Sequence, residues 1–424
     1  MKDRILNIFF SFLYASMMLV YYKIEILEWW TYAGFNGEVN LFGSIICLLF
    51  SIIFASILPT NPNTKGFLLT SIHYFFIIPS LIIIFTNDST FTYALNFFIT
   101  ITLLFFFSSL KLPGIRIAEI PSKQLMIVIV SLIIFAVLIQ IAFGGLTYFN
   151  LNPEAVYQFR RIAAADLPMI FGYIYSNVST VLIPISLVLA VILRSNALAV
   201  FVIFASVMLF GMTHHKSVLF TPFAVLILYH LFKRAKSPAQ IGWLFVLIPA
   251  ISLFEIYIIR IMLELDSPGL ISSYSARRAL LVQPLLDRIY IEYFLENPKY
   301  FWATSKFTLG LLESPHSLNP AHLIGQDIFG DPNTSANTGI VGSGFANAGF
   351  FGSALYAIIF GTIISFFGGH GRRLGHPFVA SITLIFVITI ITSTDLTNAL
   401  LTHGLLLLLA FLCIMPKSIK QRIS

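Results

Sequence analysis

Long, unbroken runs of apolar residues recur along the chain, and each is about as long as a helix that crosses a bilayer. Such a helix needs roughly 17–25 mostly apolar residues. The apolar positions in these runs are continuous rather than alternating, which excludes a membrane β-barrel. The runs cover about 5–22, 41–58, 66–85, 91–110, 124–143, 171–192, 196–212, 217–232, 240–262, 349–367, 377–393 and 397–415.

The composition places the chain among membrane proteins. It is 58% hydrophobic and 10% charged, whereas soluble domains average about 45–50% apolar and about 25% charged residues. The pattern therefore predicts an all-α polytopic integral membrane protein with about 12 transmembrane helices and a single membrane domain over 1–424. Cys47 and Cys413 each lie in an apolar run, so we expect buried thiols and no metal site.

Basic residues indicate how these helices are oriented. If the N-terminus lies in the cytoplasm and the crossings alternate, the short outer connections "TNDST" and "TSTDLTN" carry no Lys or Arg. This is the bias of the positive-inside rule, and it predicts that both termini are cytoplasmic. The net charge of +7 then reflects topology, and we expect no nucleic acid as a partner. The expected inner segments hold Lys2, Arg4, Lys65, Lys111, Arg116, Lys123, Arg194, Lys233, Arg234, Lys236, Arg372, Arg373, Lys417, Lys420 and Arg422.

Two expected outer segments are longer than the others, at about 144–170 and 263–348. The second contains "SARRALLVQPLLDRIYIEYFLENPKYF", whose apolar spacing predicts amphipathic helices that break at Pro284 and stop near Asn297. After Glu313 the residues change to Pro, Asn, Ser and Gly, which is typical of loops. A long structured loop in a compact membrane protein is usually functional, so both segments are candidate site regions.

The first candidate chemistry is a group of cations near the outer surface. Arg160 and Arg161 lie in "YQFRRIAAADLPMIFG", where they suit an anion site or, alternatively, the lipid headgroups. Lys216, in "GMTHHKS", could bind a pyrophosphate, and His214 and His215 could act as donors or bases. The alternative for these three residues is an interfacial anchor of the helix ends.

The long segment 263–348 holds further titratable groups. We expect Arg277, Arg278 and Arg288, together with Asp287, Glu292 and Glu296, to form a solvated helix face with local ion pairs, from which Arg278 could be recruited to a substrate.

Proton-transfer candidates lie further along the chain and in one span. Glu313, His316 and His322 lie in one loop, where a carboxylate and an imidazole suit proton abstraction from a hydroxyl, or only satisfy backbone and water. Glu255 lies in the outer third of a span, and an ionisable group at that depth usually lines a polar cavity.

Three motifs together resemble those of bacterial oligosaccharide repeat-unit polymerases, the Wzy-type O-antigen polymerases. They are "VYQFR", "GMTHHKSVLF" and "NTSANTGIVGSGFANAGFFG", and the layout with two enlarged outer loops is also similar. An Arg–Gly spacing reported for that family is similar to Arg161 and Gly172 in the first loop, whereas the second loop has no counterpart.

The resemblance implies a GT-C-like glycosyltransferase of the bacterial inner membrane whose site faces the periplasm. It would join oligosaccharide repeat units linked to undecaprenyl pyrophosphate, with no cofactor and no metal, alongside a polysaccharide chain-length regulator and a flippase. Arg160, Arg161, Lys216 and Arg278 would hold the pyrophosphate, and His316 or Glu313 would be the base. The remaining substrate contacts would come from Tyr157, His214, His215, Glu255, Asn333 and Asn337.

Two other functions fit the same features. A lipid-linked oligosaccharide flippase has a similar size and span count, but it needs charged residues along a path through the membrane. An O-antigen ligase uses the same donor with a different acceptor, and residue spacing does not separate it from a polymerase.

Overall fold

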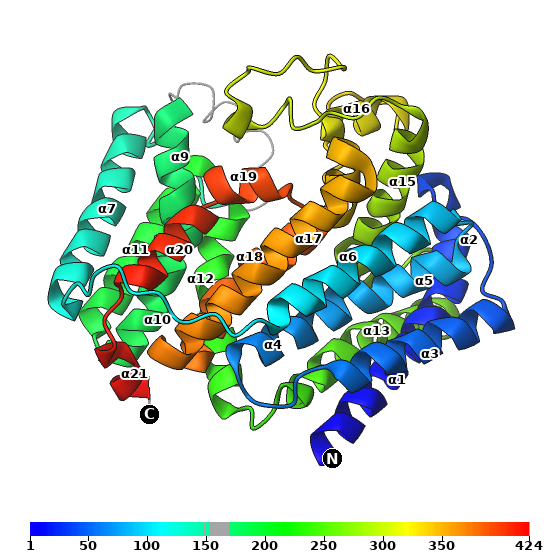
Figure 1. Cartoon of the computed structure of the whole chain (residues 1–424), viewed down its shortest axis with the longest axis horizontal. Coiled ribbons are helices and arrows are strands. Elements are labelled where there is room, and N and C mark those ends of the chain that lie inside the picture. Colours follow the sequence, from blue (N-terminus) through cyan, green and yellow to red (C-terminus); the bar gives the residue numbers. More distant parts are fainter. Residues whose placement is uncertain (148, 153–168, 424) are drawn as a thin grey trace. The chain divides into compact units, whose positions relative to one another are not determined.

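The computed structural model is all-helical in the part of the chain that it describes, residues 1–147, 149–152 and 169–423 (Figure 1). Helix accounts for 76% of it, and these residues contain no strand. Nine described helices are long and apolar enough to cross a membrane. They are Lys2–Trp29, Thr64–Thr86, Phe91–Ser109, Ser122–Ala142, Phe171–Leu193, Asn196–Thr213, Lys216–Arg234, Pro238–Met262 and Ile340–Leu374.

Three shorter apolar helices lie where the other three spans are expected. They are Leu41–Ile57, His376–Thr392 and Leu405–Ile414. The expected span over 397–415 is divided, because the chain turns at Gly404 with φ +88° between α19 (Leu396–Leu401) and α20 (Leu405–Ile414). The polytopic class is thus confirmed, and the count of twelve crossings stays a prediction.

Two compact units make up the chain, and the single membrane domain over 1–424 stays a prediction. Unit 1 comprises 1–110, 235–365 and 386–397, and unit 2 comprises 111–234, 366–385 and 398–424. In unit 1, α1 packs against α3 and α13, and α3 packs against α5. In unit 2, α10 packs against α11 and α12, and α7 packs against α11.

The helices of unit 1 include several π-helical and 3-10 turns, labelled η. They are α1 (Lys2–Tyr21), η1 (Tyr22–Ile26), α2 (Leu27–Trp29), η2 (Thr31–Ala33), α3 (Leu41–Ile57), α4 (Thr64–Ile72), η3 (His73–Ile77), α5 (Ile78–Thr86), α6 (Phe91–Ser109), η5 (Pro238–Ile241), α13 (Gly242–Tyr257), η6 (Ile258–Met262), α14 (Leu270–Ser272), η7 (Ser273–Leu281), α15 (Val282–Glu296), η8 (Lys306–Thr308) and α16 (Pro320–Asp327).

Unit 2 contains a second group of helices, and two long helices contribute residues to both units. Those of unit 2 are α7 (Ser122–Ala142), α9 (Met169–Asn177), η4 (Val178–Leu182), α10 (Ile183–Leu193), α11 (Asn196–Thr213), α12 (Lys216–Arg234), α20 and α21 (Ser418–Ile423). The shared ones are α17 (Ile340–Leu374) and α18 (His376–Thr392), and α19 begins at the boundary.

Polar caps fix where several spans begin. The side chain of Asn40 accepts a hydrogen bond from the Gly43 amide at the start of α3, and Asn63 does the same for the Gly66 amide in α4. Thr90 caps α6 in this way. Such caps satisfy amides of the first turn that have no partner within the helix, so they determine the residue at which each helix begins.

Contacts within each unit agree with alternating crossings. In unit 1, the backbone amide of Asn36 donates to Asn87 Oδ1 at 2.9 Å. This hydrogen bond joins two connections that we expect on the outer side. The Nζ of Lys65 donates to the Ser108 carbonyl oxygen at 2.9 Å, joining the start of α4 to the end of α6, and we expect both ends on the inner side. In unit 2, the Arg372 guanidinium donates to the Leu112 carbonyl at 2.5 Å, again between expected inner segments.

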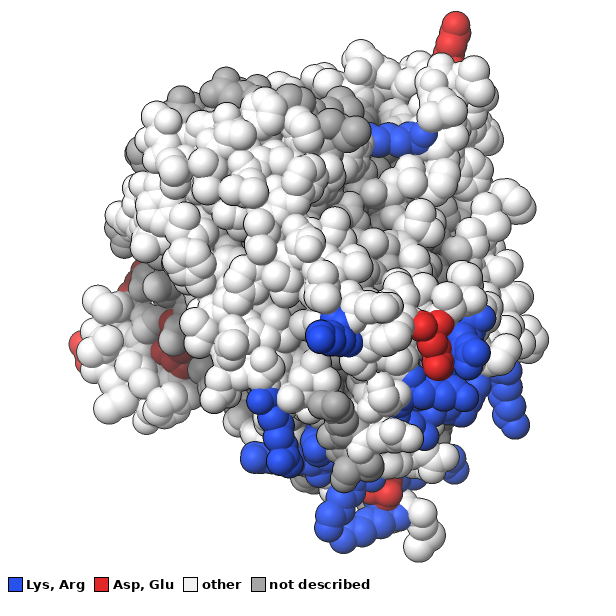
Figure 2. Space-filling view, turned by 90° about the vertical axis from the view of Figure 1, so that its left-hand side faces the viewer, with Lys and Arg blue, Asp and Glu red and all other residues white. Residues whose placement is uncertain are grey.

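Lys and Arg concentrate at this expected inner end of unit 2. Figure 2 shows them gathered at the bottom of the face that it draws. Assigning this end to the cytoplasm stays a prediction. Cys47 and Cys413 are free and buried, as predicted.

Candidate functional site

A break in α17 organises a polar site in unit 1. Ala348 (φ −152°, ψ 34°) and Gly349 (φ 60°, ψ −144°) leave the helical conformation inside α17, at the position where we expected the span to begin. The backbone amide of Tyr300 donates to the carbonyl of Ala346 at 3.0 Å, and that of Phe301 donates to the carbonyl of Asn347 at 2.9 Å. These two hydrogen bonds hold the loop after α15 against the turn of α17 that precedes the break.

A carboxylate, Asp395, lies in the connection that follows α18. Its Oδ2 accepts from the Tyr356 hydroxyl at 2.7 Å and from the Asn347 amide at 3.4 Å. Its Oδ1 accepts from the backbone amide of Thr397 at 2.8 Å and from the Thr397 hydroxyl at 2.5 Å. Asp395 is half-buried, so these donors fix the carboxylate while part of it stays accessible.

Trp302 joins this carboxylate to the loop. Its indole Nε1 donates to the Tyr356 hydroxyl at 2.8 Å, and its backbone amide donates to Asn347 Oδ1 at 3.0 Å. We call Trp302, Asn347, Tyr356 and Asp395 the Asp395 cluster. It combines residues from the loop after α15, from α17 and from the connection after α18.

Two neighbouring aromatic residues have an unusual backbone at this cluster. Phe301 and Trp302 have φ values of +46° and +62°, in the left-handed region that bulky residues rarely adopt. Such conformations are held by their surroundings and concentrate at ligand sites. Phe301 is 60% exposed. Its backbone amide binds Asn347, whose side chain contacts Asp395. Exposed aromatic rings and carboxylates are groups that suit a sugar, whose C–H face packs on a ring and whose hydroxyls donate to a carboxylate.

A second carboxylate, Asp287, is fully buried in α15. Its Oδ1 accepts from the Thr338 hydroxyl and, at 2.8 Å, from the backbone amide of Gly342 in the first turn of α17. Burial raises the pKa of Asp287 to about 7, and the two hydrogen bonds oppose that shift. Asp287 was expected on a solvated face, and that prediction is wrong, because α15 turns this residue toward the start of α17.

Of the other predictions for this segment, the expected stop near Asn297 is confirmed, since α15 ends at Glu296. The expected break at Pro284 is wrong, because α14, η7 and α15 follow one another without a gap and Pro284 lies in the first turn of α15, where a proline is tolerated. Arg288 forms the expected local ion pair with Glu292 at 3.0 Å, but it is buried rather than on a solvated face.

The proposed base His316 is held against the loop that follows α15. Its Nε2 lies 2.8 Å from the carbonyl oxygen of Pro298, and its ring lies 4.9 Å from the ring of Tyr300. A carbonyl only accepts, so Nε2 carries a proton and Nδ1 is the atom of a neutral ring that could take one. Glu313 is exposed and makes no hydrogen bond or ion pair with a described residue.

Glu255 binds the start of a helix. Its two carboxylate oxygens accept from the backbone amides of Ile271 at 2.8 Å and Ser272 at 2.6 Å. A Cβ added at Gly269 would lie 2.6 Å from Glu255 Oε2, so this close approach requires a glycine. The contact gives Glu255 a structural role, and a role in substrate binding stays a prediction.

The other predicted residues of unit 1 lie on its surface. Arg278, Asn333 and Asn337 are exposed. The backbone and side-chain nitrogens of Asn333 both donate to Asp331 in a local turn. Contact of these residues with a substrate stays a prediction.

The remaining predicted residues fall in unit 2 or outside the described residues. Tyr157, Arg160 and Arg161 lie outside the described residues. Lys216 is exposed at the start of α12, and His214 is buried with φ +58° at the end of α11. The ring of His215 lies 5.9 Å from that of Tyr175, whose hydroxyl is 2.7 Å from Thr213 Oγ1.

Sequence reasoning did not single out the Asp395 cluster. We used "TSTDLTN" only because it lacks basic residues, and a lone acid beside a span end gives no pattern that a spacing argument could use. Within the described ranges no group of three or more His, Cys, Asp or Glu residues could hold a metal ion.

Comparisons with protein-family models, with curated proteins and with solved structures give no match. The helical fold and the nine long apolar helices of the described residues define the class, a multi-pass membrane protein.

Proposed function

We propose that this chain is a membrane glycosyltransferase that joins lipid-pyrophosphate-linked oligosaccharide repeat units, as O-antigen polymerases do. The main structural support is the Asp395 cluster, where a half-buried carboxylate is held by the Tyr356 hydroxyl and the Asn347 side chain in segments that we expect on the outer side. The three sequence motifs described above supply the family to which the proposal refers.

The proposed reaction transfers a glycan between two lipid carriers. A hydroxyl of the acceptor unit attacks the anomeric carbon of the donor, and the bond from that carbon to the pyrophosphate oxygen breaks. The hydroxyl proton passes to a protein base, and undecaprenyl pyrophosphate leaves. Arg160, Arg161, Lys216 and Arg278 would stabilise the charge that develops on the departing pyrophosphate.

Two described groups suit the role of the base. His316 has an Nδ1 that can accept a proton, because Nε2 already donates to the carbonyl of Pro298. Asp395 has a half-buried carboxylate that is oriented by Tyr356 and Thr397. A base must come within hydrogen-bond reach of the acceptor hydroxyl, so a substrate complex decides between them.

A flippase is less well supported by the ionisable groups within the spans of unit 1. Arg260 pairs with Glu25 at 2.9 Å and with Glu28 at 2.6 Å. Glu255 binds backbone amides of a helix start. These groups stabilise contacts between segments, whereas a transport path needs polar groups that face an open cavity.

A gene deletion in the native bacterium separates the three functions. Loss of a polymerase leaves single repeat units on the lipid A core, loss of a ligase leaves the core bare, and loss of a flippase traps the lipid-linked unit on the cytoplasmic side. The proposal requires the first outcome. Complementation with Arg161→Ala should also leave single units, whereas Arg194→Ala, on the expected inner side, should restore long chains.

A further inference from the structure

A basic cavity lies at the expected inner end of unit 2. Its volume is about 670 Å³, and Lys111, Arg372, Arg373, Lys417 and Lys420 contribute to its lining. The three segments that contain its lining residues, 111–123, 369–376 and 416–424, hold a single acid, Glu119. The cavity therefore has a large excess of positive charge.

Hydrogen bonds from side chains to backbone carbonyls hold the walls of this cavity together. Arg372 donates to the Leu112 carbonyl, and Lys420 donates to the Arg372 carbonyl at 3.0 Å. A Cβ on Gly114 would lie 2.7 Å from the carbonyl oxygen of Gly369, so the two segments approach closely. These contacts use only part of the donor capacity of the cations.

One buried cation has an unused donor. Arg373 is 9% exposed, and its guanidinium donates to the carbonyls of Met415 and Leu412. Its Nε is buried and has no hydrogen-bond partner among the described residues. A buried donor without a partner costs free energy, which an anion in the cavity would recover.

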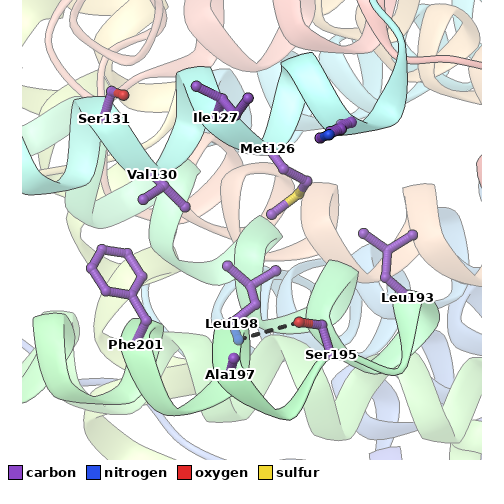
Figure 3. Close-up of a pocket in the computed structure, with 10 residues that line it drawn as sticks. Met126, Ile127, Val130, Ser131, Leu193, Ser195, Ala197, Leu198 and Phe201 are labelled. Carbon is purple, nitrogen blue, oxygen red and sulfur yellow. Dashed lines mark hydrogen bonds between the residues drawn. The ribbon is translucent and has the colours of Figure 1, made fainter.

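An apolar groove runs between α7 and α11 of the same unit. Its volume is about 540 Å³, and Figure 3 shows Met126, Val130, Leu198 and Phe201 along it. Lys123 also lines the groove, near the start of α7. From Lys123 to Ser131 an α-helix rises about 12 Å, which is enough for part of an acyl chain.

A hydrogen bond connects the groove with the basic cavity. Ser122 Oγ lies 3.1 Å from Ser418 Oγ, so the residue before Lys123 contacts the residue after Lys417. Lys123 lines the groove, and Lys417 lines the cavity. A cationic cavity beside an apolar groove is complementary to a molecule with an anionic head and an apolar chain.

We propose that unit 2 binds an anionic phospholipid at its inner end, with the headgroup phosphate at the basic cavity and one acyl chain in the groove between α7 and α11. Clusters of Lys and Arg at the cytoplasmic ends of transmembrane helices attract anionic lipids, and an adjoining groove adds apolar contact. This binding does not depend on the proposed glycosyltransferase activity.

Native mass spectrometry of the delipidated full chain, titrated with phosphatidylglycerol or phosphatidylcholine, tests the proposal. Phosphatidylglycerol should bind at least about tenfold more tightly, because only its headgroup has a net charge. The double variant Lys417→Ala/Lys420→Ala should weaken the affinity for phosphatidylglycerol about 25-fold, because each Lys near the surface contributes about fivefold. The control variant Lys233→Ala/Arg234→Ala removes the same charge from another basic pocket of unit 2, and it should change this affinity less than about twofold.

A groove variant distinguishes a lipid from a free phosphate. Val130→Trp fills the groove without a change in charge and should weaken phosphatidylglycerol binding, whereas Ile134→Trp, on the same helix but not lining the groove, should not. Equal losses in the two double variants, or equal binding of the two lipids, would overturn the proposal. So would displacement of the lipid by an equal concentration of inorganic phosphate together with unchanged lipid binding in Val130→Trp.

Discussion

Asp287 and Gly342 join two helices that are distant in the sequence, since the carboxylate in α15 accepts the backbone amide in the first turn of α17 at 2.8 Å. The acceptor is fully buried and receives a second hydrogen bond from Thr338 on the same oxygen. The other carboxylate oxygen has no hydrogen-bond partner in the part of the chain that the structure describes. This arrangement makes the packing of α15 sensitive to the protonation of one side chain.

Stability of the α15–α17 contact should fall as pH rises. Burial raises the pKa of Asp287 to about 7, whereas an unfolded Asp titrates near ~3.9. Between these two pKa values the native state holds a proton that the unfolded chain has lost. The contribution of Asp287 to stability is therefore complete below about pH 4 and is lost as pH rises through about 7. Hydrogen exchange of the Gly342 amide, corrected for intrinsic rates, measures the free energy of opening this contact, which should fall by at most ~1.4 kcal/mol per pH unit.

Two substitutions separate charge from hydrogen bonding at this position. Asp287→Asn can keep both hydrogen bonds on its oxygen, so the pH dependence should disappear while the contact remains. Asp287→Ala leaves the buried amide of Gly342 unpaired and should cost about 1–3 kcal/mol at any pH. The same pH dependence in Asp287→Asn as in the wild type would contradict this account.

The ion pair between Glu25 and Arg260 should matter more than its exposed neighbour. Glu25 is fully buried and Arg260 is its partner at 2.9 Å, whereas Glu28 is half exposed. Arg260→Ala leaves a buried charge without compensation and should cost about 3–5 kcal/mol. Glu28→Ala should cost less than about 1 kcal/mol. Thermal unfolding of the detergent-purified variants measures both, and equal losses would show that burial is not the cause.

The Asp395 cluster should be required for chain growth. Tyr356→Phe removes the hydroxyl that connects Trp302 with Asp395, and it keeps the ring that packs there. We expect shorter glycan chains with unchanged protein abundance. Asp395→Asn should reduce polymerisation about 10²-fold or more if Asp395 is the base. Full-length chains in both variants would exclude the cluster from the site.

His316 and Glu313 can be compared directly because they lie in one loop. Loss of a general base typically costs a factor of about 10²–10⁴, so His316→Gln should reach that range if His316 is the base. Glu313 is exposed and makes no hydrogen bond or ion pair with a described residue, so Glu313→Gln should cost less than about tenfold. The rate of lipid pyrophosphate release by equal amounts of purified protein measures both, and the reverse order would assign the role to Glu313.

The fold was predictable where single segments determine it. Continuous apolar runs locate the helices, and local caps such as Asn40 mark their starts. The break at Ala348–Gly349 coincides with the expected start of a span, but the helix before it was read as loop because it is rich in Gly, Ser and Asn. These small residues serve close packing: a Cβ on Gly339 would lie 2.0 Å from the Ile391 carbonyl oxygen.

The candidate site was less predictable, because its residues meet only through tertiary contacts. Trp302, Tyr356 and Asp395 come from three segments, and no spacing along the chain relates them. Asp287 looked like part of a charged helix face, since its neighbour Arg288 forms a local ion pair. Which side of an amphipathic helix is buried depends on its partner, and here the partner, α17, begins more than fifty positions later.

The most direct test is to incubate the purified protein in liposomes with undecaprenyl-pyrophosphate-linked repeat units, and to measure glycan length together with released undecaprenyl pyrophosphate. The account predicts longer glycans, one lipid pyrophosphate released for each new bond, and loss of both in Arg161→Ala. If repeat units only cross the bilayer while the glycans stay at one unit, the glycosyltransferase assignment is contradicted.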